Sequence, residues 1–133
     1  MGLNSPYKTY QNQSVTTASP GELTLMLYNG CLKFISMAKS AMRDGDYESK
    51  NFNLVKAQNI IRELMVTLDT KTEVSQNMMA MYDYIHKRLI QANVKNEVSI
   101  LEEAEEYVVE FRDTWKEILI IHRKNRFGEG GKA

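Results

Sequence analysis

This chain contains no proline after position 20, since both of its prolines fall within the first twenty residues. Proline interrupts the interior of an α-helix because it lacks a backbone N–H and its ring clashes with the preceding turn. The rest of the chain can therefore form long, uninterrupted helices. Its apolar residues recur every three or four positions, as in amphipathic helices, and no segment shows the two-residue alternation of a surface strand. The sequence thus predicts an all-α fold.

A complete helix start begins at Ser19. Ser19 is a favoured N-cap residue, and Pro20 occupies the first helical position, where a missing N–H costs nothing. Glu22 stands three residues after the cap, as in a capping box. We expect the first helix to run from Ser19 to about Arg43, with Gly45 in the left-handed conformation after it.

Three further amphipathic segments follow, at about residues 46–68, 73–94 and 99–124. Asp46 is the expected N-cap of the second helix. Residues 99–102, Ser-Ile-Leu-Glu, form a second capping box, which predicts that the fourth helix begins there.

Long amphipathic helices joined by short turns predict an antiparallel up-down four-helix bundle over residues 19–124. Residues 1–18 are polar apart from a few side chains such as Tyr7 and Tyr10, and we interpret them as an N-terminal arm. The glycine-rich residues 125–133 are expected to form a flexible tail. The three parts make up one domain with two appendages.

The composition points to a cytoplasmic protein. Seventeen basic residues balance seventeen acidic ones, so no net charge favours nucleic acid or an acidic membrane as a partner. No apolar run is long enough to span a bilayer, and the first residues lack the pattern of a signal peptide. The single Cys31 cannot form an internal disulfide, as expected in a reducing compartment.

The sequence gives no sign of catalytic chemistry. A di-iron bundle needs two Glu-x-x-His pairs, and the nearest match, Asp83 to His86, occurs once. Cys31 lies on an apolar stripe with no group placed to activate it, and His86 has no docking motif beside it for phosphotransfer. No phosphate-binding glycine loop is present. We therefore predict that the protein is not an enzyme and holds no metal or cofactor.

The helices carry more apolar residues than four single stripes need, and the first helix is apolar on more than one side. The surplus residues are Leu25, Met26, Leu32, Phe52, Ile60, Met79 and Ile121. Two interpretations stay open on the pattern alone: a generous core with scattered surface apolar residues, or a groove for a partner helix.

Several short motifs carry a family resemblance. They are Tyr10-Gln11, Val15, Thr17-Ala18-Ser19-Pro20-Gly21-Glu22-Leu23, Met26-Leu27-Tyr28-Asn29-Gly30 and, later in the same order, Ile61-Arg62-Glu63-Leu64, Tyr82-Asp83-Tyr84-Ile85 and Arg112-Asp113-Thr114-Trp115. In these motifs the chain resembles the flagellar secretion chaperone FliS family over about residues 7–118.

The resemblance implies a cytoplasmic four-helix bundle that binds the C-terminal region of flagellin in a one-to-one complex. Such a protein keeps flagellin from polymerising and helps deliver it to the flagellar type III export apparatus. The export apparatus is therefore expected to be an indirect partner. The balanced charge predicts no nucleic-acid partner and no stable membrane association, and we expect the free protein to form at most a weak homodimer. The alternative is a structural helical bundle that self-associates and has no secretion substrate.

The expected partner-binding residues follow from the resemblance and from the surplus apolar positions. Tyr7 and Tyr10 are expected to cover the groove or contact the partner, since in the family the arm can occupy this surface when flagellin is absent. The groove residues are expected to be Leu25, Met26, Asn29, Leu32 and Lys33 on the first helix, and Ile60 and Glu63 on the second. Trp115 is expected to anchor the core instead.

Overall fold

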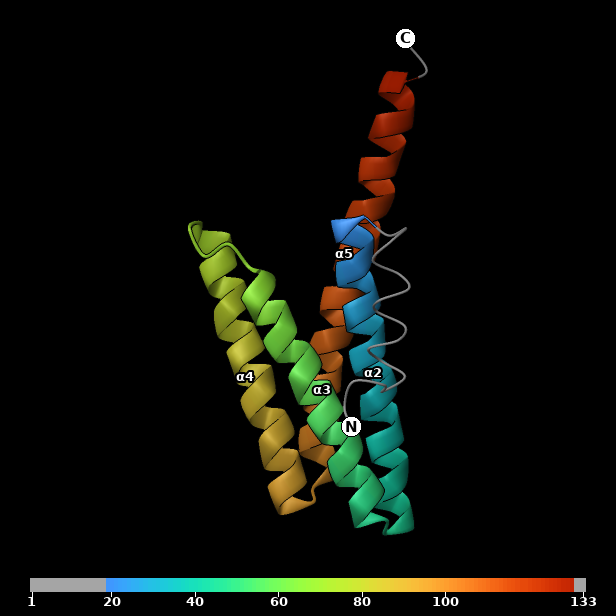
Figure 1. Ribbon diagram of the computed structural model, residues 1–133, viewed down its shortest axis with the longest axis vertical. Coiled ribbons are helices and arrows are strands. Elements are labelled where there is room, and N and C mark those ends of the chain that lie inside the picture. The colour runs from blue at the N-terminus through green and yellow to red at the C-terminus, as the bar shows by residue number, and fades with distance from the viewer. Residues whose placement is uncertain (1–18, 131–133) are drawn as a thin grey trace, which may run out of the picture.

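The computed structural model describes the backbone of residues 19–130 and the side chains of residues 19–125. This part of the chain forms four helices: α2 (Pro20–Asp44), α3 (Tyr47–Thr67), α4 (Glu73–Lys95) and α5 (Val98–Gly130). Successive helices run antiparallel, and the described residues contain no strand (Figure 1). The predicted all-α four-helix bundle is confirmed, whereas the expected N-terminal arm lies outside the described residues.

The helices form a ring in which each packs against two others. The contacting pairs are α2–α3, α3–α4, α4–α5 and α5–α2. Figure 1 shows that α3 and α4 diverge from α2 and α5 toward the turn that joins α3 to α4. We call this the open end, and the end with the other two turns the closed end. At the open end α5 also runs on past the start of α2.

The first two helices begin and end where their local sequence predicts. The Ser19 hydroxyl accepts a hydrogen bond from the Glu22 backbone N–H at 3.2 Å. Gly45 has a φ of 71°, and its N–H donates to carbonyls in the last turn of α2. The Asp46 carboxylate then accepts from the Ser49 N–H at 3.1 Å and caps α3. Satisfying these otherwise unpaired backbone groups permits a turn of only two residues between α2 and α3.

The boundaries of the last helix differ from the prediction. Asn96 adopts the left-handed conformation, with a φ of 54°, and ends α4. Because this residue reverses the chain at once, α5 begins at Val98, and Ser99 lies inside its first turn rather than at the cap. The predicted tail is also too long, since the helix continues beyond Lys124 to Gly130. Each residue added to an existing helix adds a backbone hydrogen bond, so a helix can extend beyond the part that packs against its neighbours.

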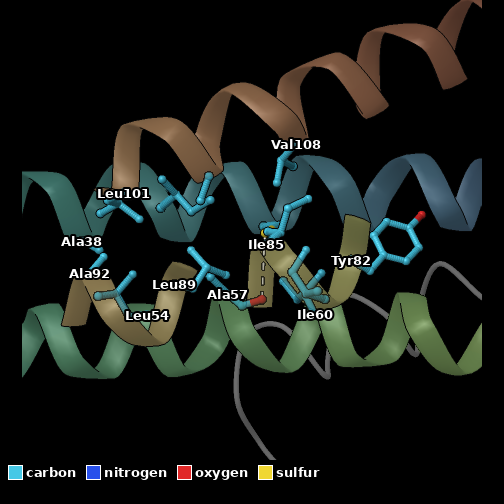
Figure 2. Close-up of a cluster of buried hydrophobic side chains, with 14 of the residues drawn as sticks. Ala38, Leu54, Ala57, Ile60, Tyr82, Ile85, Leu89, Ala92, Leu101 and Val108 are labelled. Carbon is cyan, nitrogen blue, oxygen red and sulfur yellow. Dashed lines mark hydrogen bonds between the residues drawn. The ribbon is translucent and has the colours of Figure 1, made fainter. Parts of the chain in front are cut away.

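The hydrophobic core fills the closed end and the middle of the bundle. Figure 2 shows side chains from all four helices meeting there, including Leu54, Ile60, Ile85 and Leu101. These four side chains are at most 1% exposed. Their burial is the main source of stability in a bundle of this kind.

Polar contacts connect neighbouring helices around this core. The Lys39 ammonium lies 2.9 Å from a Glu105 carboxylate oxygen and links α2 to α5. Glu103 on α5 accepts from both the Tyr84 hydroxyl, at 2.7 Å, and the Arg88 guanidinium, at 2.9 Å, on α4. The hydrogen bond from Tyr84 is the main reason that the pKa of Glu103 is lowered.

Candidate partner-binding surface

The five predicted residues on α2 share one sector of that helix, and Leu32, at the edge of the sector, packs against the core. Leu25, Met26 and Leu32 are half-buried, and Asn29 and Lys33 are exposed. Their spacing places them within one broad sector of the helix surface, beside the buried stripe. The structure thus brings these five side chains together on one accessible side of α2, where they combine apolar and polar groups.

The predicted residues on α3 do not share one surface. Ile60 is 1% exposed and packs inside the core, so its predicted place in a groove is wrong for this conformation (Figure 2). Because α3 packs against both α2 and α4, it buries two adjacent sides, and Ile60 belongs to one of them. The exposed apolar side of α3 carries Phe52 and Val55 instead. Glu63 is half-buried.

Tyr7 and Tyr10 lie outside the described residues. Their predicted part in covering or contacting the partner-binding surface therefore stays a prediction. The first described residue, Ser19, lies at the open end.

The fully buried positions stop well short of the open end. The first buried residue of α2 is Leu27, and the last of α3 is Leu64. On α4 burial begins at Tyr82, nine residues after the helix starts at Glu73. On α5 it ends at Val108. Beyond these positions the apolar side chains are half-buried or exposed, and Leu68, Met78 and Trp115 pack against the edge of the core.

Apolar side chains nevertheless continue along the inward sides of the helices. Val74 and Met78 lie eleven and seven residues before Ile85, on the same side of α4. Val74 is 69% exposed, and Met78 is half-buried. The half-buried or exposed apolar side chains at this end are called the open-end surface. They are Leu68, Val74, Met78, Met81, Trp115 and Ile118.

This surface could not be recognised from the sequence, because a core stripe and an uncovered stripe have the same pattern of residues. Met78, Trp115 and Ile118 recur at the helical spacing of the buried residues on their helices. The helical period shows which side a residue faces but not whether a neighbouring helix reaches it. The abundance of methionine was the one available signal, since methionine suits adaptable binding surfaces as well as cores.

A group of aromatic side chains lies at the edge of the core beside the open-end surface. The Tyr28 ring stacks parallel to Phe111 at a centroid distance of 6.1 Å, and Tyr82 packs at 5.3 Å from the same ring. The Tyr28 and Tyr82 hydroxyls are hydrogen bonded to each other across the bundle. In Figure 2 the Tyr82 hydroxyl points away from the other labelled core residues. Burial raises the pKa of both tyrosines, so both remain protonated at neutral pH.

The start of α2 is tied to α5 at the open end. The Trp115 indole N–H donates to the Gly21 carbonyl at 2.8 Å, and the indole packs against the core. A Cβ atom on Gly21 would lie 2.7 Å from Leu119 Cδ2, so the absence of a side chain permits this close approach. Arg123 also lies 3.7 Å from the Glu22 carboxylate. Trp115 therefore anchors α2 to α5, while α4 diverges.

Neither a reactive thiol nor a metal-binding cluster occurs among the described residues. Cys31 is fully buried, and burial raises the pKa of its thiol to about 12, so the thiolate is not available at neutral pH. Within the described residues no three His, Cys, Asp or Glu side chains are close enough together to hold a metal ion. In the same part of the chain no helix is long and apolar enough to cross a membrane. What stands out chemically is uncovered apolar surface.

A family model described as "Flagellar protein FliS" matches residues 3–122 of the chain. The chain belongs to the FliS family. It is 56% identical to the flagellar secretion chaperone FliS of Bacillus subtilis (strain 168), with all 133 residues aligned and both chains fully covered. It is 41% identical over 110 residues to FliS of Escherichia coli (strain K12), covering 80% of this chain and 81% of that one.

A solved structure titled "Crystal structure of flagellar chaperone from bacteria" has the same fold. It superposes with a TM-score of 0.70 over 86% of this chain and 98% of the other, at 17% identity. FliS is a chaperone family, so the uncovered apolar surface occurs in a protein whose relatives are flagellar secretion chaperones.

Proposed function

We propose that this protein is a cytoplasmic export chaperone for flagellin and has no enzymatic activity. It binds the C-terminal region of flagellin one-to-one, keeps it from polymerising, and helps deliver it to the flagellar type III secretion apparatus. Membership of the FliS family supports the chaperone role. The observation that carries the proposal is the apolar surface left uncovered on α2 and at the open end.

The uncovered residues suit a partner that presents amphipathic helical segments. On α2, Leu25 and Leu32 would pack against apolar side chains of the partner, while Asn29 and Lys33 would bind its polar groups. Met26 can change its side-chain conformation to fit different contours. Each segment that docks buries apolar area without any chemical step, so neither binding nor release requires nucleotide hydrolysis by this chain.

Binding to flagellin should depend on the flagellin C-terminal region. Calorimetry is expected to give a one-to-one complex with full-length flagellin and no measurable binding to flagellin that lacks this region. Leu25→Asp should weaken the complex at least about tenfold, because a carboxylate would have to be desolvated in the interface. Val66→Asp, at an 83% exposed position on α3, is the control and should bind as the unmodified chain does.

The variants should first be shown to be helical by circular dichroism, so that a loss of binding is not a loss of fold. Equal affinity for full-length and truncated flagellin would contradict the proposal. If Leu25→Asp and Val66→Asp weakened binding equally, the α2 surface would not be part of the flagellin-binding site.

Trp115 provides a direct measure of whether the partner reaches the open end. It is the only tryptophan of the chain and is half-buried there. Adding a tryptophan-free peptide from the flagellin C-terminal region should shift its emission to shorter wavelengths, because docking would remove water from the indole. Trp115→Phe is the control for signals from the peptide. Calorimetric binding without any change in emission would confine the partner to other surfaces, such as that of α2.

A further inference from the structure

Tyr28 and Tyr82 join two helices that are not neighbours in the bundle. α2 packs against α3 and α5, and α4 lies across the diagonal from it. The Tyr28 and Tyr82 hydroxyls nevertheless meet and share a hydrogen bond. Both side chains are almost inaccessible to solvent, with Tyr28 1% and Tyr82 2% exposed. This hydrogen bond is therefore a direct polar contact across the interior of the bundle.

The pair lies where α4 begins to diverge from α2. Tyr82 is the first buried residue of α4, and Figure 2 shows it at the edge of the labelled core cluster. Met78 and Val74 precede it by about one and two helical turns and are half-buried and 69% exposed. On α2, Tyr28 directly follows the first buried residue, Leu27. The hydroxyl pair thus marks the boundary between the core and the open-end surface.

The helices on the two sides of this contact are held differently. The start of α2 is tied to α5, because the Trp115 indole donates to the Gly21 carbonyl at the open end. On α4 the ion pair of Arg88 with Glu103 of α5 lies on the closed-end side of Tyr82. A change in the width of the open end would therefore come from the first turns of α4, which precede this ion pair.

The hydrogen bond satisfies only part of the tyrosine pair. Two hydroxyls carry two hydrogens, and only one of these lies between the two oxygens. Among the described residues, neither hydroxyl has a second hydrogen-bond partner. Phe111 contacts both rings and offers them only an apolar surface. Because separated hydroxyls could each bind water or a partner's polar groups, the hydrogen bond favours the closed arrangement only modestly.

We propose that the Tyr28–Tyr82 pair is a latch that limits how far α4 can swing away from α2 at the open end. When the latch opens, the first turns of α4 move outward. Both hydroxyls then become available to backbone carbonyls of a helical segment that enters the open end. The latch thereby sets how readily a partner enters, and this last step rests on the proposed chaperone function.

Single and double removal of the hydroxyls should have opposite effects. Tyr28→Phe or Tyr82→Phe alone leaves one buried hydroxyl unpaired, which is less favourable than removing both. Each single variant should therefore open and admit water to the remaining hydroxyl, and the double variant should close again. Tyr84→Phe is the matched control on the same helix, since Tyr84 is 40% exposed and its acceptor Glu103 also binds Arg88.

Double electron–electron resonance on the free protein measures the width of the open end. Spin labels are placed at Val74→Cys and Ile118→Cys, with Cys31→Ala in every sample. Their mean distance should lengthen by at least about 2 Å in each single variant, the scale of a helix shift, and return in the double variant. Labels at Arg43→Cys and Lys95→Cys, where α2 and α4 end, should show no change. Circular dichroism checks that every variant is folded.

Two results would overturn the latch. One is an unchanged open-end distance in both single variants, and the other is a double variant that stays as wide as they are. Because these measurements contain no flagellin, they do not depend on the proposed function.

Calorimetry with a peptide from the flagellin C-terminal region tests whether the latch controls entry. Each single variant should bind at least about threefold more tightly than the unmodified chain, because a larger fraction of it is already open. The double variant and Tyr84→Phe should bind like the unmodified chain. Equal affinities in all variants would overturn the role of the latch in entry. A peptide that binds none of them, while the distances change as expected, would instead contradict the proposed chaperone function.

Discussion

Ile85→Ala is expected to lower the free energy of unfolding by about 2–5 kcal/mol. Ile85 is 0% exposed and lies in the middle of the cluster to which all four helices contribute (Figure 2). Removing its outer carbons loses their transfer free energy and leaves a cavity that the surrounding helices can close only in part. For a small bundle, a loss of this size is a large share of the total stability.

Ile90→Ala is the matched control for this prediction. It removes the same atoms from the same helix, but Ile90 is 38% exposed, so the change should cost less than about 1 kcal/mol. Urea titrations followed by circular dichroism should show a lower midpoint for Ile85→Ala at an unchanged slope. Similar midpoints for the two variants would mean that α4 does not pack into the core as described.

Alkaline pH is expected to destabilise the protein through three buried acidic groups. Burial raises the pKa of Cys31 from 9.0 to about 12 and also raises the pKa of Tyr28 and Tyr82 from 10.0. In the unfolded chain these groups lose their protons at the ordinary pKa, whereas in the folded chain they remain neutral. Their stabilising contribution is therefore complete below about pH 9 and is lost as the pH rises.

The size of the alkaline effect follows from proton linkage. Each group that is ionised only in the unfolded state lowers the free energy of unfolding by about 1.4 kcal/mol per pH unit. Cys31 alone should therefore lower it by on the order of 3 kcal/mol between pH 9 and 11. Urea titrations at several pH values should show this slope. In Cys31→Ala the decline should begin about one pH unit later, at the ordinary pKa of the tyrosines.

Tyr28→Phe should further reduce the loss of unfolding free energy with rising pH. Tyr47→Phe is the control and should leave this pH dependence unchanged, because Tyr47 is 60% exposed. An alkaline profile that is the same in Cys31→Ala and in the unmodified chain would show that the thiol is ionised in the folded protein. That result would contradict the complete burial of Cys31 between α2 and α3.

The local sequence was sufficient for those features that depend on a few neighbouring residues. The cap at Ser19, the left-handed Gly45 and the cap at Asp46 were all predicted, because each satisfies backbone groups within four residues of itself. The prediction failed at the start of α5, where two local signals compete. Asn96 ends α4 in the left-handed conformation, and the helix restarts at Val98 before the capping signal at Ser99 is reached.

The candidate site was only partly predictable. Leu25, Asn29 and Leu32 were predicted from the family resemblance and from surplus apolar positions, and they share one partly accessible sector of α2. Ile60 was assigned to the surface, but it is buried, since a helix with two neighbours buries two of its sides. No residue pattern distinguishes the buried side from the exposed one when both are apolar.

The sequence by itself thus determined the four helices, their antiparallel order and the side of each that is apolar. Only the tertiary structure decided where the core closes, since this depends on the distance between helices that are far apart in the sequence. Ile85 and Met78 lie seven residues apart on the same side of α4, yet the first is buried and the second is not fully covered. Met78 is less buried than Ile85 because α4 diverges from α5 toward the open end. This divergence leaves apolar surface available for binding.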